Sequence, residues 1–152
     1  MANVPNLVQL NIVVSDMAAT LAFYRRLGWD IETPSAEHAV AQLSNGLGVE
    51  FDTTGFTTSW DSGFAGGSGG TTLLGLAVES REAVDDIYAD FVAQDYNGCQ
   101  PPYDAFWGSR YAIIEDPDGN RVGLMSPSEE SARFWPPSAP PRASSWIPRR
   151  RA

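Results

Sequence analysis

The feature that most constrains the fold is a succession of predicted elements that occurs twice: one strand, one helix and then further strands. In the first half, a β-like run at 7–14 leads to a helical sequence at 17–28, and Ser15 and Asp16 precede it as capping side chains. Its further strands are expected around 39–43 and 48–52, with Asn45-Gly46 as the turn between them. This half is therefore a strand–helix–strands module.

The second half repeats the same plan. A strand is predicted at 73–79, Ser80 is a candidate cap, and apolar residues at helical spacing mark a helix at 81–94. A loop through Pro101 and Pro102 is expected next, and it leads to strand-like runs at 106–115 and 121–125. The second run is joined to the first by an Asp-Pro-Asp-Gly turn.

These patterns predict one domain at 1–130, made of two modules at about 1–60 and 71–127 with a Gly-rich connector at 61–70. Residues 131–152 form a Pro/Arg-rich C-terminal arm whose composition cannot make a core. Two alternatives remain for this arm. It is a disordered tail, or it packs on its own domain or on a partner through Trp135 and Trp146.

Charge and composition exclude several classes of function. The chain has no Lys, and residues 1–134 hold all 19 Asp and Glu residues against six Arg. Such an acidic body argues against binding to nucleic acid and favours a neutral or cationic partner. The alternative is that the acidic residues only keep the protein soluble. A single Cys, no signal-peptide pattern and no apolar run of about 20 residues lead us to expect a cytoplasmic protein without a membrane segment.

Two stretches resemble a known family. "LNIVVSDMAATLAFYRRLGW" and "FWGSRYAIIEDPDGNRVGL" are similar to the vicinal oxygen chelate superfamily, the group of glyoxalases, bleomycin resistance proteins and extradiol dioxygenases. The resemblance covers about 7–127. It implies an α+β fold of two βαβββ modules, each a curved half-barrel sheet that is usually completed by the other module or by a second subunit. We expect a homodimer.

The resemblance also implies where a metal would be bound. Metalloenzymes of this group place four ligands in the cup, and the matching positions here are Gln9, Glu50, Leu73 and Gly123. Leu73 and Gly123 have no side-chain donor, and a catalytic divalent site needs three or more suitable protein ligands. We therefore expect no metal and no other cofactor in this set.

Two further residues with reactive side chains are predicted to be inert. His38, the only histidine, precedes a strand and matches none of the ligand positions, so it is expected to be a surface or structural residue. Cys99 lies in a Gly/Pro loop with no basic residue nearby in sequence, which predicts an unreactive thiol. A lysine-dependent mechanism is excluded because the chain has no lysine.

Glu50 is the strongest candidate for chemistry. Buried in a cup without metal, its carboxylate would be a candidate general base. The alternative is that Glu50 only lines the cup and is hydrogen-bonded to Gln9.

Aromatic residues indicate ligand binding more directly, since flat rings on loops can enclose a planar molecule. Candidate ligand-binding residues are Gln9, Glu50, Asp52, Trp60, Leu73, Tyr103, Trp107, Tyr111 and Gly123. Asp52, Asp61 and Asp104 lie among the rings in sequence and would attract a cation. Phe51, Phe106 and Tyr111 are equally consistent with core positions.

The sequence favours binding over catalysis. Our leading hypothesis is a metal-free small-molecule binding protein similar to the bleomycin resistance type, for an aromatic or hydrophobic ligand, neutral or cationic, such as an antibiotic. The alternatives are a metal-dependent glyoxalase- or dioxygenase-like enzyme using Gln9 and Glu50, or a metal-independent isomerase with Glu50 as base. A structural role with the arm as a docking element is also open.

Overall fold

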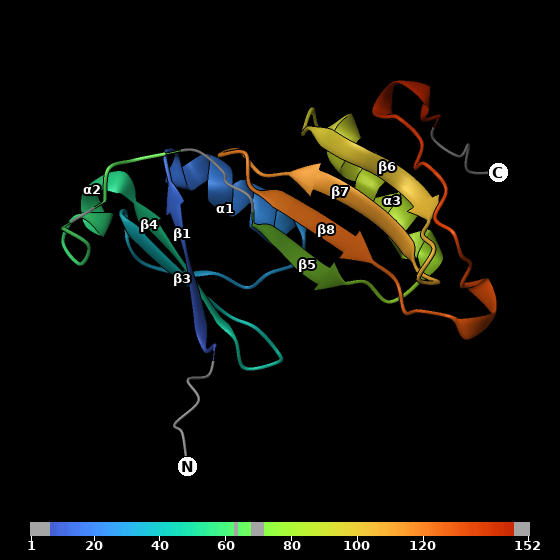
Figure 1. The fold of residues 1–152 in the computed structure, drawn as a ribbon. Coiled ribbons are helices and arrows are strands. Elements are labelled where there is room, and N and C mark those ends of the chain that lie inside the picture. Colours follow the sequence, from blue (N-terminus) through green and yellow to red (C-terminus); the bar gives the residue numbers. More distant parts are fainter. Residues whose placement is uncertain (1–6, 63, 68–71, 148–152) are drawn as a thin grey trace, which may run out of the picture. The chain divides into compact units, whose positions relative to one another are not determined.

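Figure 1 shows the computed structural model, which describes residues 7–62, 64–67 and 72–147. The chain divides into two compact units, 1–67 and 68–152. Each unit contains its own four-stranded sheet and is described by itself.

The first unit contains the elements β1 (Gln9–Val14), α1 (Met17–Arg26), β2 (Glu32–Ser35), β3 (His38–Gln42), β4 (Gly48–Thr53) and α2 (Thr54–Thr57). Its strand order is β1-β4-β3-β2. Strand β1 pairs with β4 in parallel, and the other neighbours are antiparallel. The short strand β2 and the single-turn helix α2 were not predicted from the sequence.

The second unit contains the elements β5 (Leu73–Ala77), α3 (Arg81–Ala93), β6 (Gly98–Asp104), β7 (Arg110–Glu115), β8 (Arg121–Met125) and the 3₁₀ turns η1 (Glu130–Ala132) and η2 (Ala143–Ser145). Its order β5-β8-β7-β6 repeats the topology of the first unit, again with one parallel pair. The predicted α+β class with two βαβββ modules is confirmed.

The predicted helix caps are in place. Asp16 Oδ1 accepts a hydrogen bond from the Ala19 amide at 3.0 Å, and Ser80 Oγ accepts one from the Ala83 amide at 3.1 Å. Gly28 follows α1 with φ of 91°, a conformation that glycine adopts readily. These local features fix where each helix meets its sheet.

Each helix covers one face of its own sheet. In the first unit, Phe23 and Tyr24 of α1 are buried, as are the inward strand residues Val49 and Phe51. In the second unit, α3 buries Val84, Tyr88 and Phe91, while Ala112, Ile114, Val122 and Leu124 are the buried strand positions. Because strand side chains alternate, the intervening residues occupy the face turned away from α1 or α3, which we call the uncovered face, although Phe56 of α2 lies against His38 on it in the first unit. The predicted site residues of the strands lie on this face.

The prediction of a loop through Pro101 and Pro102 is wrong, because both residues belong to β6. Proline lacks the amide donor that an inner strand needs, so a Pro-Pro pair normally argues against a strand. Strand β6 is the edge of its sheet, and its pairing with β7 is irregular between Gln100 and Tyr103. The prolines therefore lie where missing donors cost little.

The described part of the C-terminal arm, 131–147, contacts its own unit. Gln100 Nε2 donates to the Pro141 carbonyl at 2.9 Å, and the rings of Tyr88 and Trp146 meet edge to face at 4.9 Å. The Phe134 amide also donates to the Phe106 carbonyl at 3.0 Å. The arm thus runs beside β6 and α3, as Figure 1 shows in red.

No helix among the described residues is long and apolar enough to cross a membrane.

Candidate functional site

A cluster of polar side chains, which we call the polar cluster, lies on the uncovered face of the first sheet. It consists of Gln9, Asn11, His38, Glu50 and Asp52. Asp52 is at its centre and has no exposed surface. Its Oδ1 lies 2.6 Å from His38 Nδ1, and its Oδ2 accepts a hydrogen bond from Asn11 Nδ2 at 3.0 Å. A buried carboxylate is thus satisfied by two side chains from neighbouring strands.

Glu50 joins the polar cluster through Asn11. Asn11 Nδ2 donates to Glu50 Oε2 at 3.3 Å, and Asn11 Oδ1 accepts from Gln9 Nε2 at 2.8 Å. Within the described residues, Gln9 and Glu50 therefore do not bond each other directly, as the lining alternative supposed. Asn11 bridges them, which follows from the register, because Asn11 pairs with Glu50 and Gln9 pairs with Gly48.

Sequence reasoning missed the position of His38. Strand β3 begins at His38, one residue earlier than predicted, and pairs it directly with Asp52 on β4. Residues directly opposite in an antiparallel pair point to the same face. The Phe56 ring lies 5.2 Å from the imidazole at 32°, so His38 is held between a carboxylate and an aromatic ring. The only histidine of the chain has partners after all.

In the second unit, Leu73 and Gly123 lie beside Tyr111 on the uncovered face. A Cβ atom added at Gly123 would be 2.7 Å from the Tyr111 hydroxyl and 3.0 Å from Leu73 Cδ2. The space where a side chain of residue 123 would start is therefore filled by the tyrosine. The absent side chain makes room for an aromatic ring.

Tyr103, Tyr111 and Trp107 form a row of rings with edge-to-face contacts. The centroids of Tyr103 and Tyr111 are 6.2 Å apart, and those of Tyr111 and Trp107 are 5.2 Å apart. Burial raises the pKa of the Tyr111 hydroxyl above its ordinary value, and Tyr103 adds to this shift. Burial also raises the pKa of Tyr103. Both hydroxyls are thus neutral donors at physiological pH.

A cavity of about 330 Å³ opens at the end of this row. Its apolar lining comes from Ala77, Val78, Trp107, Met125 and Pro127, and its polar lining from Ser109, Ser126, Ser128 and Arg133. Two buried polar atoms of these residues, Trp107 Nε1 and Ser109 Oγ, have no hydrogen-bond partner within the described structure. An unmade buried hydrogen bond costs about 1–3 kcal/mol, and because both atoms are fully buried, a ligand would have to displace neighbouring atoms to supply a partner.

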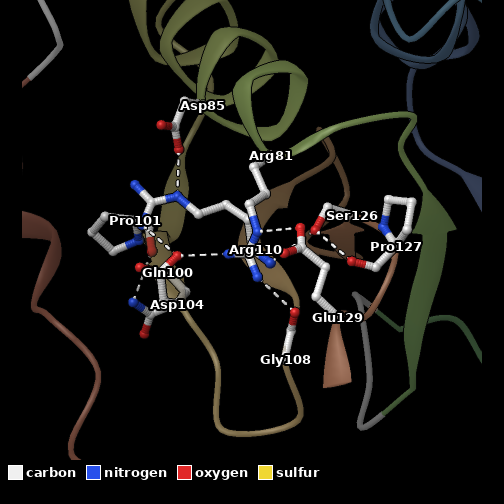
Figure 2. A network of polar contacts seen from close by, with 10 residues as sticks. All are labelled: Arg81, Asp85, Gln100, Pro101, Asp104, Gly108, Arg110, Ser126, Pro127 and Glu129. Carbon is white, nitrogen blue, oxygen red and sulfur yellow. Dashed lines mark hydrogen bonds and ion pairs between the residues drawn. The ribbon is translucent and has the colours of Figure 1, made fainter. Parts of the chain in front are cut away.

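An ion-pair network holds the loop that carries Trp107 (Figure 2). Arg81 donates to the Gly108 carbonyl at 2.6 Å and pairs with Asp104 at 2.9 Å and with Glu129 at 3.0 Å. Arg110 Nε pairs with Asp85 at 2.8 Å. The Trp107 carbonyl accepts from Ser128 Oγ at 2.6 Å. Asp104, predicted to attract a cationic ligand, is therefore used by two arginines of the protein itself.

The structure brings some predicted residues together and separates others. Gln9, Glu50 and Asp52 meet in the polar cluster of the first unit, whereas Leu73, Gly123, Tyr103, Trp107 and Tyr111 gather in the second. Trp60 follows α2 in the first unit with half of its surface exposed, and the structure gives it no ring partner in the described chain. Asn11 and Ser109 were missed, although strand alternation from Gln9 would have indicated Asn11.

Comparison with known proteins agrees with this fold. The profile of the Glyoxalase/Bleomycin resistance protein/Dioxygenase superfamily matches residues 6–124. The chain belongs to this superfamily. No match was found among curated proteins.

Solved structures of the superfamily share the fold. A glyoxalase-related enzyme from Fulvimarina pelagi superposes with a TM-score of 0.73 at 21% identity, covering 82% of this chain and 89% of its own. A family enzyme from Burkholderia phytofirmans PsJN gives 0.67 at 22% identity, covering 80% and 98%. Lactoylglutathione lyase from Agrobacterium tumefaciens gives 0.62 at 17% identity, covering 80% and 92%. At these identities the likeness shows the fold alone.

The four positions at which the resemblance predicts metal ligands do not suit a metal in this superfamily member. Leu73 and Gly123 offer no donor atom, and the Tyr111 ring fills the space at Gly123. Gln9 and Glu50 are both hydrogen-bonded to Asn11. Two of the four positions therefore carry a side chain with a donor atom, and two do not.

Proposed function

We propose that the protein binds an aromatic or hydrophobic small molecule without the superfamily's four-ligand metal centre. The observation that carries the proposal is the cavity of about 330 Å³, at which Trp107 Nε1 and Ser109 Oγ are buried without partners in the described chain. Small-molecule sites are typically concave and mostly apolar, with a few placed polar groups. A flat apolar ligand with one hydrogen-bond acceptor fits this description.

The contacts that hold the loop of Trp107 and Gly108 also support ligand binding. Arg81 and Ser128 hold the backbone carbonyls of Gly108 and Trp107, so that this side of the cavity is formed before a ligand arrives. A preformed site avoids the entropic cost of ordering a loop on binding. The second unit is therefore suited to a rigid ligand.

The lining of the cavity carries little charge. Among the described residues that line the cavity, Arg133 is the only charged one, and it pairs with Glu130 at 3.4 Å. The cavity itself thus does not select a cation. A preference for cationic ligands would arise from the acidity of the whole chain, whose net charge is −9.

Fluorescence titration tests the proposal. Tryptophan emission should change saturably with 2-naphthol and with naphthalene compounds that carry an ammonium or a sulfonate group. Ser109→Ala should weaken the binding of 2-naphthol about 5- to 30-fold, because the buried hydroxyl is lost as a partner. Ser131→Ala, an exposed serine of η1, is the matched control. Unchanged emission across the three compounds, or equal binding by both variants, would contradict the proposal.

We further propose that the protein forms a homodimer. The support is the uncovered sheet face of the second unit, on which Leu73 is 39% and Met125 is 38% exposed. Exposed apolar side chains gathered on one face are typical of interaction sites. Light scattering coupled to gel filtration should give twice the chain mass of 16.5 kDa, and a monomer at micromolar concentration would contradict the dimer.

A further inference from the structure

We propose that His38, Glu50 and Asp52 bind a divalent transition-metal ion within the first unit. Each residue offers one ligand atom, and these three atoms lie within 4.8 Å of one another. The set shares only Glu50 with the four positions that the superfamily resemblance implies. It goes beyond the proposed binding of an aromatic ligand, and it involves no residue of the cavity.

The strands hold these three side chains on one face. His38 and Asp52 are directly opposite on β3 and β4, and Glu50 lies two residues before Asp52 on the same strand. Sites built on adjacent strands are better fixed than sites on loops. Metal–ligand bonds of about 2.0–2.2 Å place ligand atoms about 3 to 4.4 Å apart, so small side-chain rotations suffice for the observed spacing.

The charge of the polar cluster calls for a cation. Two carboxylates face one imidazole, and Asp52 has no exposed surface. In the part of the chain that the structure describes, the only ion pair of Asp52 is with His38, and Glu50 has none. Buried carboxylates in proteins are normally paired or coordinate a metal. An ion between the three ligand atoms would complete the pairing.

Asn11 supplies the supporting contacts that metal ligands need. Its amide nitrogen donates to Glu50 Oε2 and to Asp52 Oδ2, and Gln9 fixes the orientation of the amide. Such outer contacts orient the ligating groups in metal sites. Within the described residues, Asp52 Oδ1 is held by His38 Nδ1 alone, so an ion would take the place of this one contact. The Phe56 ring shields one side of the imidazole.

The donor set predicts which ions bind. One imidazole nitrogen with two carboxylate oxygens suits Zn²⁺, Mn²⁺ or Fe²⁺. Ca²⁺ requires six to eight oxygen ligands, so three protein ligands of which one is nitrogen should hold it poorly. Selectivity for Zn²⁺ over Ca²⁺ therefore separates a built site from general attraction to an acidic surface.

The test uses the full chain without an affinity tag, stripped with a chelator and titrated with Zn²⁺, Mn²⁺ and Ca²⁺ by calorimetry. Elemental analysis after desalting gives the stoichiometry. We expect about one Zn²⁺ per chain, a higher melting temperature with Zn²⁺, and no comparable effect of Ca²⁺. Because the chain has one histidine, the ring signals of His38 in NMR spectra should shift on Zn²⁺ binding.

Variants decide whether these residues are the ligands. His38→Gln should weaken Zn²⁺ binding at least about 100-fold, more than the loss of a supporting contact does. Glu50→Gln should also weaken it, whereas Glu32→Gln removes the same charge at an exposed position of β2 and should not. Melting curves verify that each variant is folded. Absence of stoichiometric Zn²⁺ and Mn²⁺, or a folded His38→Gln variant that binds them unchanged, would overturn the proposal.

Discussion

The hydroxyl oxygen of Tyr111 lies 2.7 Å from the point that a Cβ atom on Gly123 would occupy. Gly123→Ala therefore forces the ring or the strand to move. Because the Tyr111 hydroxyl and Leu73 Cδ2 are the ends of side chains that can turn aside, we expect a loss of only about 1 kcal/mol in the free energy of unfolding, at the low end for overpacked sites. Urea denaturation measures it.

Gly75 provides the matched control, because it pairs directly with Gly123 and a Cβ there meets no atom within 4 Å. Gly75→Ala should leave the protein equally stable or stabilise it by about 0.5–1 kcal/mol. Adding Tyr111→Phe to Gly123→Ala should recover part of the loss, since the nearest atom is removed. Equal effects of the two alanine variants would contradict this account of the glycine.

The pair Arg110–Asp85 is predicted to stabilise the second unit. Both side chains are 17% exposed, and the two atoms are 2.8 Å apart. Asp85→Asn leaves a largely buried guanidinium with a weaker partner, so the free energy of unfolding should fall by about 1–3 kcal/mol. The control is Glu130→Gln, which breaks the exposed pair with Arg133 and should cost less than about 0.5 kcal/mol. An Asp85→Asn variant with the same free energy of unfolding as the wild type would show that the network is dispensable.

Cys99 should react slowly with alkylating agents. Burial raises the pKa of its thiol to about 11, and Glu115 adds to the shift through a hydrogen bond and its charge. At pH 8 the reactive thiolate is therefore scarce. Iodoacetamide labelling followed by mass spectrometry should be much slower than that of a free thiol and faster in Glu115→Gln. Rapid labelling of the folded wild-type chain would disprove the protected state.

Stability should fall at alkaline pH because of the aromatic row. Burial raises the pKa of Tyr103 and Tyr111 above 10.0, the value for an exposed tyrosine. The unfolded chain thus loses these protons first, so the stabilising contribution is complete below about pH 10 and is lost as pH rises. Urea denaturation between about pH 9 and 11, in a Cys99→Ser background, measures the slope. Tyr111→Phe should flatten it, and an unchanged slope would contradict the prediction.

Much of the fold could be predicted from local patterns. The caps Asp16 and Ser80 and the turn that ends at Gly119 act through neighbours within four residues, so the sequence displays them directly. Strand β6 was mistaken for a loop because its prolines are tolerated only at a sheet edge, and edge position depends on the whole topology. Whether a strand tolerates proline therefore depends on the place of the strand in the sheet, which the neighbouring sequence does not show.

The candidate site was predicted less completely. Gln9 and Glu50 were found by matching strand positions, and Asp52 by its place among aromatic residues. The role of His38 depended on the start of β3, and strand ends are hard to predict. If the predicted strand had begun at His38 instead of residue 39, the imidazole would have been placed opposite Asp52. The cavity beside Trp107 depends on a loop held by Arg81 from a helix far away in sequence, and no local pattern encodes that contact.

The prolines of β6 also affect whether a strand of another molecule can add to this edge of the sheet. An exposed sheet edge normally presents a row of amide donors and carbonyl acceptors to which a foreign strand can add. Pro101 and Pro102 interrupt the donors of this edge, and the Gln100 side chain ties the arm beside it through the Pro141 carbonyl. On this side, the second unit is closed to strand addition and hence to the growth of an aggregate.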